Sequence, residues 1–442
     1  MTNVMEKVWK VSLVTVLSAS VLAACGNDDS GNNASSGASP SASAGASASA
    51  SATDEGGEIT IWNAGIMSND DSGEISKDDL PLYKTIKAFE ESNPNYKVNV
   101  VDYSMDQLTQ AFTAANLAKE GPDIVAMWAG SMTLGYKDYL VDLSGYLNDA
   151  EKQEYDTSDI THVGFDQSGR NIGLPLEAST YQIYYNKQLL SDAGYADFQP
   201  KTWDELLAAA QKLKDQGQTP LVVGDSGGAM STWAVSEFLG DLLGSDGLKG
   251  YLTGETKVNG DAFKQSMEAW KQLFDRGLTN KDFISMDDGT AIRTFVNGDA
   301  AMVLHGSWAV RDFSTMGDNV GIIKLPAITA DAPFADTIVS QPVINLSVTT
   351  YTKHIDKSVE LAKMLSSKAF KEATSATMYK DPTSLALATQ SMSWVQEGHN
   401  VIGFDSIVKA DAANEFYKMA PSVMSGREKL DALASKMDDL NQ

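Results

Sequence analysis

Glu58-Ile59-Thr60-Ile61-Trp62 alternates polar and apolar side chains, as a half-buried β-strand does, and it opens the stretch that decides the fold class. Two further strands and two helices are predicted between this strand and Trp128. The strands are expected at 96–101 and 123–128, and the helices at 82–91 and 106–119. Because strands alternate with helices, the stretch predicts a parallel sheet covered by helices on both faces.

A second α/β unit is predicted from about Gly173 onward. Its clearest helix begins at Thr202, whose hydroxyl can accept a hydrogen bond from the Glu205 amide as in a capping box, and it runs to Lys214. Further strands are predicted at 183–185, 221–223, 301–305, 321–326 and 343–348, and further helices at 234–243 and 262–276. The sequence therefore predicts an α/β protein, and its 442 residues allow two or three domains.

Composition excludes several classes of function. The chain has 59 acidic residues against 34 Lys and Arg, a formal net charge of −25. This acidity argues against nucleic-acid binding, which needs a basic surface, and against electrostatic docking on anionic lipid. A single cysteine rules out an intrachain disulfide, a Cys-rich zinc site and dithiol redox chemistry.

The single cysteine, Cys25, follows a segment with the features of a signal peptide. Two lysines precede an apolar run at 11–21, which is short for a transmembrane helix. The run ends in Leu22-Ala23-Ala24-Cys25, which resembles the lipobox of bacterial lipoproteins. We therefore expect a signal peptide at 1–24 and a diacylglyceryl group on the Cys25 thiol, which would anchor the protein to a membrane.

The segment that follows Cys25 predicts a tether. Residues 26–57 are almost all Ser, Ala, Gly, Asn and Asp, and they show no apolar periodicity. Such a segment cannot bury enough apolar surface to offset the entropy of ordering. We expect residues 25–57 to form a lipidated, disordered tether with a root-mean-square span of roughly 30 Å.

One motif carries a catalytic alternative. Gly224-Asp225-Ser226-Gly227-Gly228 fits the G-x-S-x-G nucleophile elbow and also occurs in trypsin-like proteases. Trypsin-like proteases are disulfide-bonded β-barrels, and the glycines after Ser226 are a poor start for an elbow helix. We interpret the motif as a strand-to-helix loop and keep a secreted serine hydrolase, with a histidine from 305, 354 or 399, as the less favoured alternative.

Metal and cofactor sites are not predicted. The four histidines, at 162, 305, 354 and 399, lie far apart and form no H-x-x-x-H pair. The acidic runs lack the ligand spacing of an EF-hand. With so many acidic residues, no pair chosen by eye indicates a glycosidase.

The tryptophans point toward a binding site. Trp203 and Trp270 lie in helical patterns, where packing is the expected role, whereas five others follow strands or lie in loops: Trp62, Trp128, Trp233, Trp308 and Trp394. In open α/β sheets, ligands bind beyond the carboxyl ends of strands. An indole there offers a flat apolar face and an N–H donor, which suit the C–H face and hydroxyls of a sugar.

Several motifs, in the same order over about 270 residues, resemble landmarks of extracellular solute-binding proteins of the maltose-binding-protein type. They are Glu58–Trp62, Gly121-Pro122-Asp123-Ile124, Gly173-Leu174-Pro175, Tyr184-Tyr185-Asn186-Lys187, Pro200–Leu206, Phe295–Ala301, Gly306-Ser307-Trp308 and Gly321–Pro326. The resemblance implies a periplasmic-binding-protein-like α/β fold with two lobes, crossover strands and a ligand cleft between the lobes. One lobe would comprise 58–175 and about 335–375, and the other 176–334 and about 376–442.

The resemblance also implies ligand-binding residues. Trp62 and Asn63 end the first strand, and Trp128 ends the Gly-Pro-Asp-Ile strand. Glu177 follows the Gly-Leu-Pro crossover, where a structural hinge salt bridge is the alternative role. The remaining candidates are Tyr181, Trp233, Trp308 and Gln341, whereas no motif fixes the place of Trp394.

The implied function is that of a receptor for an ABC importer of a sugar or oligosaccharide, without covalent chemistry and without a cofactor. Its partners would be the ligand, the permease subunits and the membrane that the lipid reaches, but not nucleic acid. It would be a monomer on the outer face of a Gram-positive cell membrane. A receptor for a non-sugar solute, such as a polyamine or an iron complex, is the alternative, although the few histidines disfavour iron.

Overall fold

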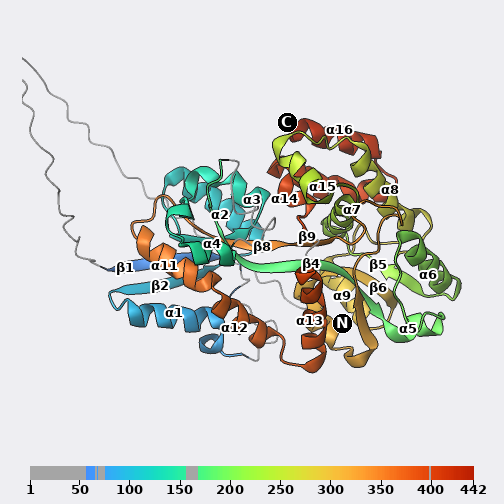
Figure 1. Cartoon of the computed structure of the whole chain (residues 1–442), viewed down its shortest axis with the longest axis horizontal. Coiled ribbons are helices and arrows are strands. Elements are labelled where there is room, and N and C mark those ends of the chain that lie inside the picture. Colours follow the sequence, from blue (N-terminus) through green and yellow to red (C-terminus); the bar gives the residue numbers. More distant parts are fainter. Residues whose placement is uncertain (1–55, 65–66, 68–74, 156–167, 398–399) are drawn as a thin grey trace, which may run out of the picture. The chain divides into compact units, whose positions relative to one another are not determined.

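The computed structural model describes residues 56–64, 67, 75–155, 168–397 and 400–442, and all structural statements concern these residues (Figure 1). The predicted signal peptide, Cys25, most of the tether, His162 and His399 lie outside them. From Asp54 onward the chain forms one compact unit.

The first sheet begins as the sequence predicts, with three parallel strands. β1 pairs in parallel with β2 on one side and with β3 on the other. Helices α1 and α2 provide the crossovers that parallel strands need. These elements are β1 (Gly57–Asn63), α1 (Pro81–Ser92), β2 (Tyr96–Asp102), α2 (Met105–Ala118) and β3 (Ile124–Trp128).

Two long strands join the first sheet to the second. β8 (Ile338–Val348) pairs antiparallel with β3, so the sheet is mixed where the sequence predicts parallel pairing alone. β4 (Leu174–Asn186) pairs antiparallel with β8 over its first part and with β6 over its last part. The sequence predicts only 183–185 of this strand, because irregular register around Glu177 interrupts the alternating pattern. Figure 1 shows both strands running from one group of elements to the other.

The second sheet is built around β4. β6 pairs in parallel with β5, and β7 pairs antiparallel with β4. The strand order through both sheets is β2-β1-β3-β8-β4-β6-β5, with the short β9 beside β8. The new strands are β5 (Thr219–Val222), β6 (Ala300–Gly306), β7 (Val320–Ile323) and β9 (Asn400–Val401).

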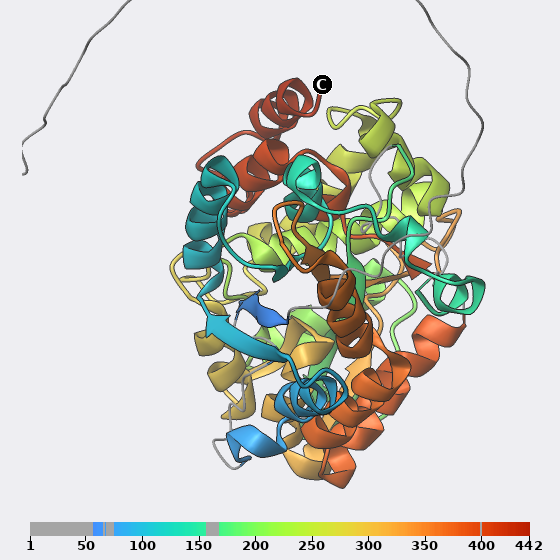
Figure 2. The same ribbon diagram turned by 90° about the vertical axis from the view of Figure 1, so that its left-hand side faces the viewer.

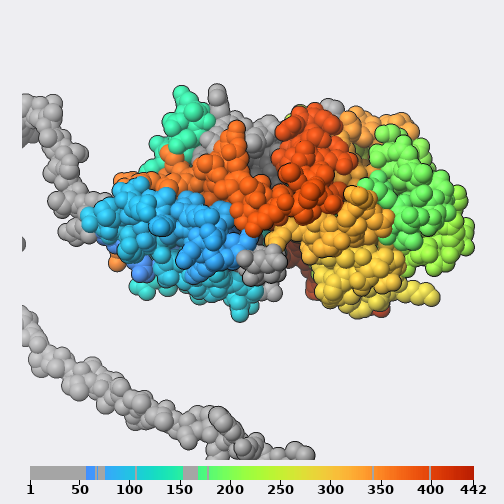
Figure 3. All heavy atoms as spheres, turned by 90° about the horizontal axis from the view of Figure 1, so that it is seen from below, coloured from blue at the N-terminus to red at the C-terminus, as the bar shows by residue number. Residues whose placement is uncertain are grey.

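Helices from distant parts of the sequence lie side by side on the sheets. For example, α1 packs against α11 and α12, as Figure 2 shows in blue and orange. In Figure 3 the orange surface belongs to residues late in the sequence. It lies next to the blue surface of the first elements and to the yellow and green surface of the middle of the chain. The remaining helices are α3 (Ser131–Gly135), α4 (Asp149–Tyr155), α5 (Lys187–Asp192), α6 (Trp203–Asp215), α7 (Ala229–Thr253), α8 (Asp261–Asp275), α9 (Asp288–Val296), α10 (Val310–Ser314), α11 (Ile355–Ser366), α12 (Lys368–Met378), α13 (Pro382–Gln396), α14 (Phe404–Ile407), α15 (Ala410–Met424) and α16 (Leu430–Leu440).

Each sheet has an apolar core of its own. Ile59, Ile61 and Phe89 are fully buried under the first sheet. The packing roles predicted for Trp203 and Trp270 are confirmed, since both indoles are buried in the second core. The Trp203 Nε1 donates to the Ala269 carbonyl at 2.9 Å, so burial leaves its polar atom paired.

The predicted cap of α6 is also present, with one difference. The Thr202 hydroxyl accepts from the Glu205 backbone N–H at 3.3 Å. The Glu205 carboxylate accepts from the Lys201 backbone N–H at 2.7 Å, one residue before the position that a capping box uses. Both contacts fix where the helix begins.

Candidate functional site

Three aromatic side chains from three elements meet at the edge of the second sheet. Trp233 lies on α7, Trp308 follows β6, and Tyr181 lies on β4. The Trp233 ring stacks on Tyr181 with 5.2 Å between centroids, and Trp308 meets Trp233 edge-on at 5.3 Å. Trp233 is 8% exposed, Tyr181 is buried and Trp308 is partly buried, so the sequence-predicted candidates form a packed wall here.

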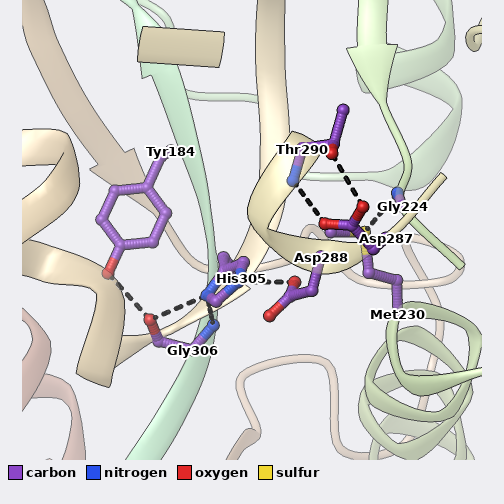
Figure 4. A network of polar contacts seen from close by, with 8 residues as sticks. All are labelled: Tyr184, Gly224, Met230, Asp287, Asp288, Thr290, His305 and Gly306. Carbon is purple, nitrogen blue, oxygen red and sulfur yellow. Dashed lines mark hydrogen bonds and ion pairs between the residues drawn. The ribbon is translucent and has the colours of Figure 1, made fainter. Parts of the chain in front are cut away.

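A buried histidine supports this wall from the strand behind it. The His305 ring lies 5.3 Å from Trp233 and 5.6 Å from Trp308. Its Nδ1 accepts from the Gly306 N–H at 2.9 Å, so its Nε2 carries the proton that is donated to Asp288 Oδ1 at 2.8 Å. Figure 4 shows Asp288 pointing at the ring from α9, while the Tyr184 hydroxyl reaches the Gly306 carbonyl at 3.2 Å.

Gly306 is needed for the position of the Trp308 indole. A Cβ atom at this residue would lie 2.0 Å from the Trp308 ring, far inside van der Waals contact. The indole therefore folds back over the strand end, where any larger residue would displace it. Steric fit therefore explains why a glycine stands two residues before Trp308 in this motif.

The glycine-rich stretch 224–228 is a strand-to-helix loop, as the sequence analysis interprets it. Gly228 has φ +76°, and a Cβ atom there would lie 2.2 Å from the Tyr417 carbonyl oxygen. The Asp225 carboxylate accepts from the Ser231 hydroxyl at 2.6 Å, and Ser231 in turn accepts from Trp270 Nε1 at 3.0 Å. Burial raises the pKa of Asp225 to about 6, opposed by the hydrogen bonds from Ser231.

Among the described residues, Ser226 has no side-chain partner that would activate it as a nucleophile. Its side chain is exposed, and its backbone N–H donates to the Met286 carbonyl at 3.1 Å. Among the described residues, no hydrogen bond joins Ser226 to a histidine, and His305 is committed to Gly306 and Asp288. The neighbouring Asp225 accepts from Ser231, so the described residues place no nucleophile, base and orienting acid in line at this loop.

The first sheet contributes an exposed indole. Trp128 ends β3 and is 47% exposed, although the strand before it is buried. Its carbonyl accepts from the Thr133 hydroxyl at 2.7 Å, which fixes the turn into α3. A large apolar side chain that a rigid turn holds in solvent is a suitable contact for a ligand.

The other two candidates of the first sheet are more enclosed. Trp62 is partly buried and packs on Tyr103 and Phe112 at 5.1 and 6.5 Å. Asn63 is fully buried, and its Nδ2 donates to Asp102 Oδ1 at 2.8 Å. Because the residue is fully buried, direct contact between Asn63 and a ligand requires movement of the atoms that cover it.

Glu177 and Gln341 lie on the two crossing strands. The backbone of Glu177 pairs with Ile344, at the irregular register of β4, and Gln341 pairs with Ser179. Bulges of this kind often lie next to binding sites, because they redirect side chains. Trp394, which no motif places, is partly buried against the second core.

A short helix near the C-terminus, α14, packs against α7 near Trp233, and none of the sequence-predicted candidates lies on it. α14 is pinned to α7 by the Phe404 N–H, which donates to the Ser236 hydroxyl at 2.9 Å, one turn beyond Trp233. Tyr417 on α15 donates to Asp405 Oδ2 at 2.7 Å. No pattern in the sequence marks Asp405, because α14 is only four residues long and its position depends on tertiary contacts.

α14 also touches the first sheet's side of the molecule. Gly130, with φ +70°, lies so close that a Cβ atom there would be 2.6 Å from the Ser406 Cβ. Ala129, the residue after Trp128, belongs to the core of the second sheet. α14 therefore contacts both helix α7 and the turn that follows β3.

The described residues give less support for a metal site, a membrane-spanning helix or a binding site in another hollow. Within the described ranges, no group of three or more His, Cys, Asp and Glu side chains could hold a metal ion. None of the described helices combines the length and apolar character needed to cross a membrane. A hollow of about 740 Å³ lies among α1, α11 and α12, and no predicted site residue lines it.

Comparisons with known proteins give a consistent result. A family model described as bacterial extracellular solute-binding protein matches residues 73–372. A binding protein of Brucella abortus is 26% identical over 302 residues, which cover 61% of this chain and 69% of that protein. The galactooligosaccharide-binding protein of Bacillus subtilis is 23% identical over 379 residues, covering 85% and 80%.

The solved structures agree with this family in fold. One of them, published with work on xylan utilization by Caldanaerobius polysaccharolyticus, has a TM-score of 0.72 at 20% identity. The match covers 86% of this chain and 99% of that one. At this identity the likeness establishes the architecture alone.

Proposed function

Because the chain belongs to the bacterial extracellular solute-binding protein family, we propose that it captures a sugar or oligosaccharide outside the cell and delivers it to an ABC importer. The proposal is supported by the family match together with two aromatic features, an exposed Trp128 at the end of β3 and the packed Trp233–Trp308 wall of the second sheet. The galactooligosaccharide-binding relative supports the ligand class. The proposal includes no covalent step and no cofactor.

Sugar chemistry fits this arrangement of side chains. Indole faces bury the C–H faces of pyranose rings, and flanking polar groups bind the hydroxyls. We assign Trp62, Asn63, Trp128, Glu177, Tyr181, Trp233, Trp308 and Gln341 to the ligand site, with the lobes divided at 58–175 with about 335–375 and at 176–334 with about 376–442.

The test is calorimetric titration with xylotriose, a galactotriose, maltotriose and spermidine. We expect saturable binding of at least one trisaccharide. Binding of spermidine alone would replace the sugar by a polyamine as the ligand. Hydrolysis of a trisaccharide, or covalent labelling of Ser226 by a fluorophosphonate probe, would instead favour a hydrolase.

Hinge closure is expected to accompany binding. β4 and β8 are the long strands shared by both sheets. We expect them to bend at the irregular register around Glu177. Small-angle scattering of the mature protein should show a smaller radius of gyration at saturating sugar. An identical profile with and without a sugar that binds by calorimetry would mean that the site is rigid.

A lipid anchor at Cys25 is proposed for the same protein. Cys25→Ser should abolish lipidation and release the protein from membranes, because an acidic chain has no other affinity for anionic lipid. The measurement is membrane fractionation with a salt wash, beside the wild type. A variant that stays with the washed membranes would refute the anchor while leaving the ligand proposal intact.

A further inference from the structure

We propose that Asp405 belongs to the ligand site and that its Oδ1 accepts a hydrogen bond from a hydroxyl group of the bound sugar. The inference rests on the proposed function and deepens it. It adds a polar contact from the C-terminal segment to the aromatic residues, and it restricts the ligand to compounds that offer a hydroxyl donor and carry no negative charge.

The first support is the position of Asp405. The residue before it, Phe404, is hydrogen-bonded to Ser236 on the same helix as Trp233 and three residues after it. Residues three apart on a helix share a face. Asp405 is therefore held within one helical turn of the aromatic wall, by a contact of 2.9 Å that burial protects from water.

The second support is that the residues on either side of Asp405 contact both sides of the proposed site. Ser406, the next residue, touches Gly130, which lies two residues beyond Trp128. In the hinge motion proposed above, opening would separate this contact and expose the carboxylate, and closure would bury it against the ligand.

The third support is an unused acceptor. Asp405 Oδ2 accepts from the Tyr417 hydroxyl, whereas Oδ1 is buried and has no hydrogen-bond partner among the described residues. A carboxylate has about four lone-pair positions, and nearly all buried polar atoms in proteins are paired. A ligand hydroxyl would supply the missing donor.

The surroundings of Asp405 favour a neutral donor. Burial raises the pKa of its carboxyl, and the hydrogen bond from Tyr417 and the nearby backbone N–H groups of Asp405 and Ser406 oppose that rise. Neither N–H is aligned for a hydrogen bond to Oδ1. Among the described residues, no lysine or arginine pairs with this carboxylate, so nothing offsets its repulsion of a uronate or a sugar phosphate.

The experiment compares Asp405→Asn with the wild type by calorimetry, using whichever trisaccharide of the set above binds and a galacturonic acid trimer as the anionic probe. The amide can still accept from Tyr417 but presents an N–H₂ group where Oδ1 accepted. We expect affinity for the neutral trisaccharide to fall by about 10- to 150-fold, the range for a hydrogen bond to a charged group. The wild type should not bind the anionic trimer.

Asp241→Asn is the matched control. It makes the same change at a buried carboxylate whose two oxygens already accept from the Ile328 N–H at 2.8 Å and the Thr337 hydroxyl at 3.1 Å. This variant should keep wild-type affinity. If Asp405→Asn fails to fold by circular dichroism, a monodeoxy series of the trisaccharide on the wild type and on Asp405→Ala decides.

Each possible result of these titrations either supports or contradicts the role of Asp405. Loss of affinity at one deoxy position in the wild type, and a smaller loss at that position in the position-405 variant, supports the inference. Wild-type affinity of Asp405→Asn, equal losses in all proteins of the deoxy series, or tight binding of the anionic trimer overturns it. Failure of the wild type to bind any sugar refutes the proposed function itself, which is a distinct outcome.

Discussion

Trp128→Ala is expected to weaken binding of the cognate sugar by about 30- to 1,000-fold, since truncation of an aromatic interface anchor typically costs about 2–4 kcal/mol. The indole is 47% exposed at the end of β3, so it contributes little to the core. The midpoint of thermal unfolding without sugar should therefore barely move. Calorimetric titration and thermal unfolding of the same preparation measure both quantities.

Trp203→Ala serves as the control for this experiment. Its indole is 1% exposed and bonded to Ala269, so truncation should destabilise the fold by about 3–5 kcal/mol. Trp308→Ala should show a mixed effect, because Trp308 packs on Trp233 and Tyr181. Full-strength sugar binding by Trp128→Ala would remove Trp128 from the site without affecting the family assignment.

The second large effect concerns stability and pH. Burial raises the pKa of Asp241 from 3.8 to about 7, opposed by hydrogen bonds from Ile328 and Thr337. Between these pH values the folded protein holds a proton that the unfolded chain has lost, so this group makes stability fall as pH rises. At 1.36 kcal/mol per pH unit, the decrease from this group alone is about 4 kcal/mol by pH 7.5.

The measurement is urea unfolding of the wild type and Asp241→Asn between pH 4 and pH 7.5. The variant lacks the titrating group, so its stability relative to the wild type should rise across this window by about 4 kcal/mol. The offset at pH 4 reports how well the amide fits, and only the change with pH tests the prediction. Asp246→Asn, at an exposed carboxylate, controls for the loss of one negative charge. Parallel curves for Asp241→Asn and the wild type would contradict the prediction.

The sequence predicts the fold class correctly because its local signals agree with the tertiary structure. Residues 58–62 and 96–101 alternate as their half-buried strands require, and Thr202 caps its helix as expected. β4 is the main exception. Its first part crosses between sheets with irregular register, so no periodic pattern records it, and the antiparallel pairing of β3 with β8 is a property of long-range topology.

The candidate site is predictable only in part, for a related reason. Trp128, Trp233 and Trp308 can be identified from the sequence, because each is a large aromatic residue at or near the end of a strand. Asp405 carries none, because acidic residues are common in this chain and α14 is placed by contacts with Ser236, Tyr417 and Gly130. The sequence therefore indicates the residues of the aromatic wall but not helix α14, which packs against α7 beside Trp233.

The antiparallel pairing of β8 with β3 has a consequence for the order of folding. β3 ends at residue 128 and β8 begins at residue 338, so the first sheet lacks its inner neighbour until most of the chain has been made. Pairing across such a separation carries a large loop-closure entropy and forms slowly. A growing chain would therefore complete its native structure only after β8, in its C-terminal third, has been made. If the chain is exported before it folds, as the predicted signal peptide implies, this delay would keep it competent for export.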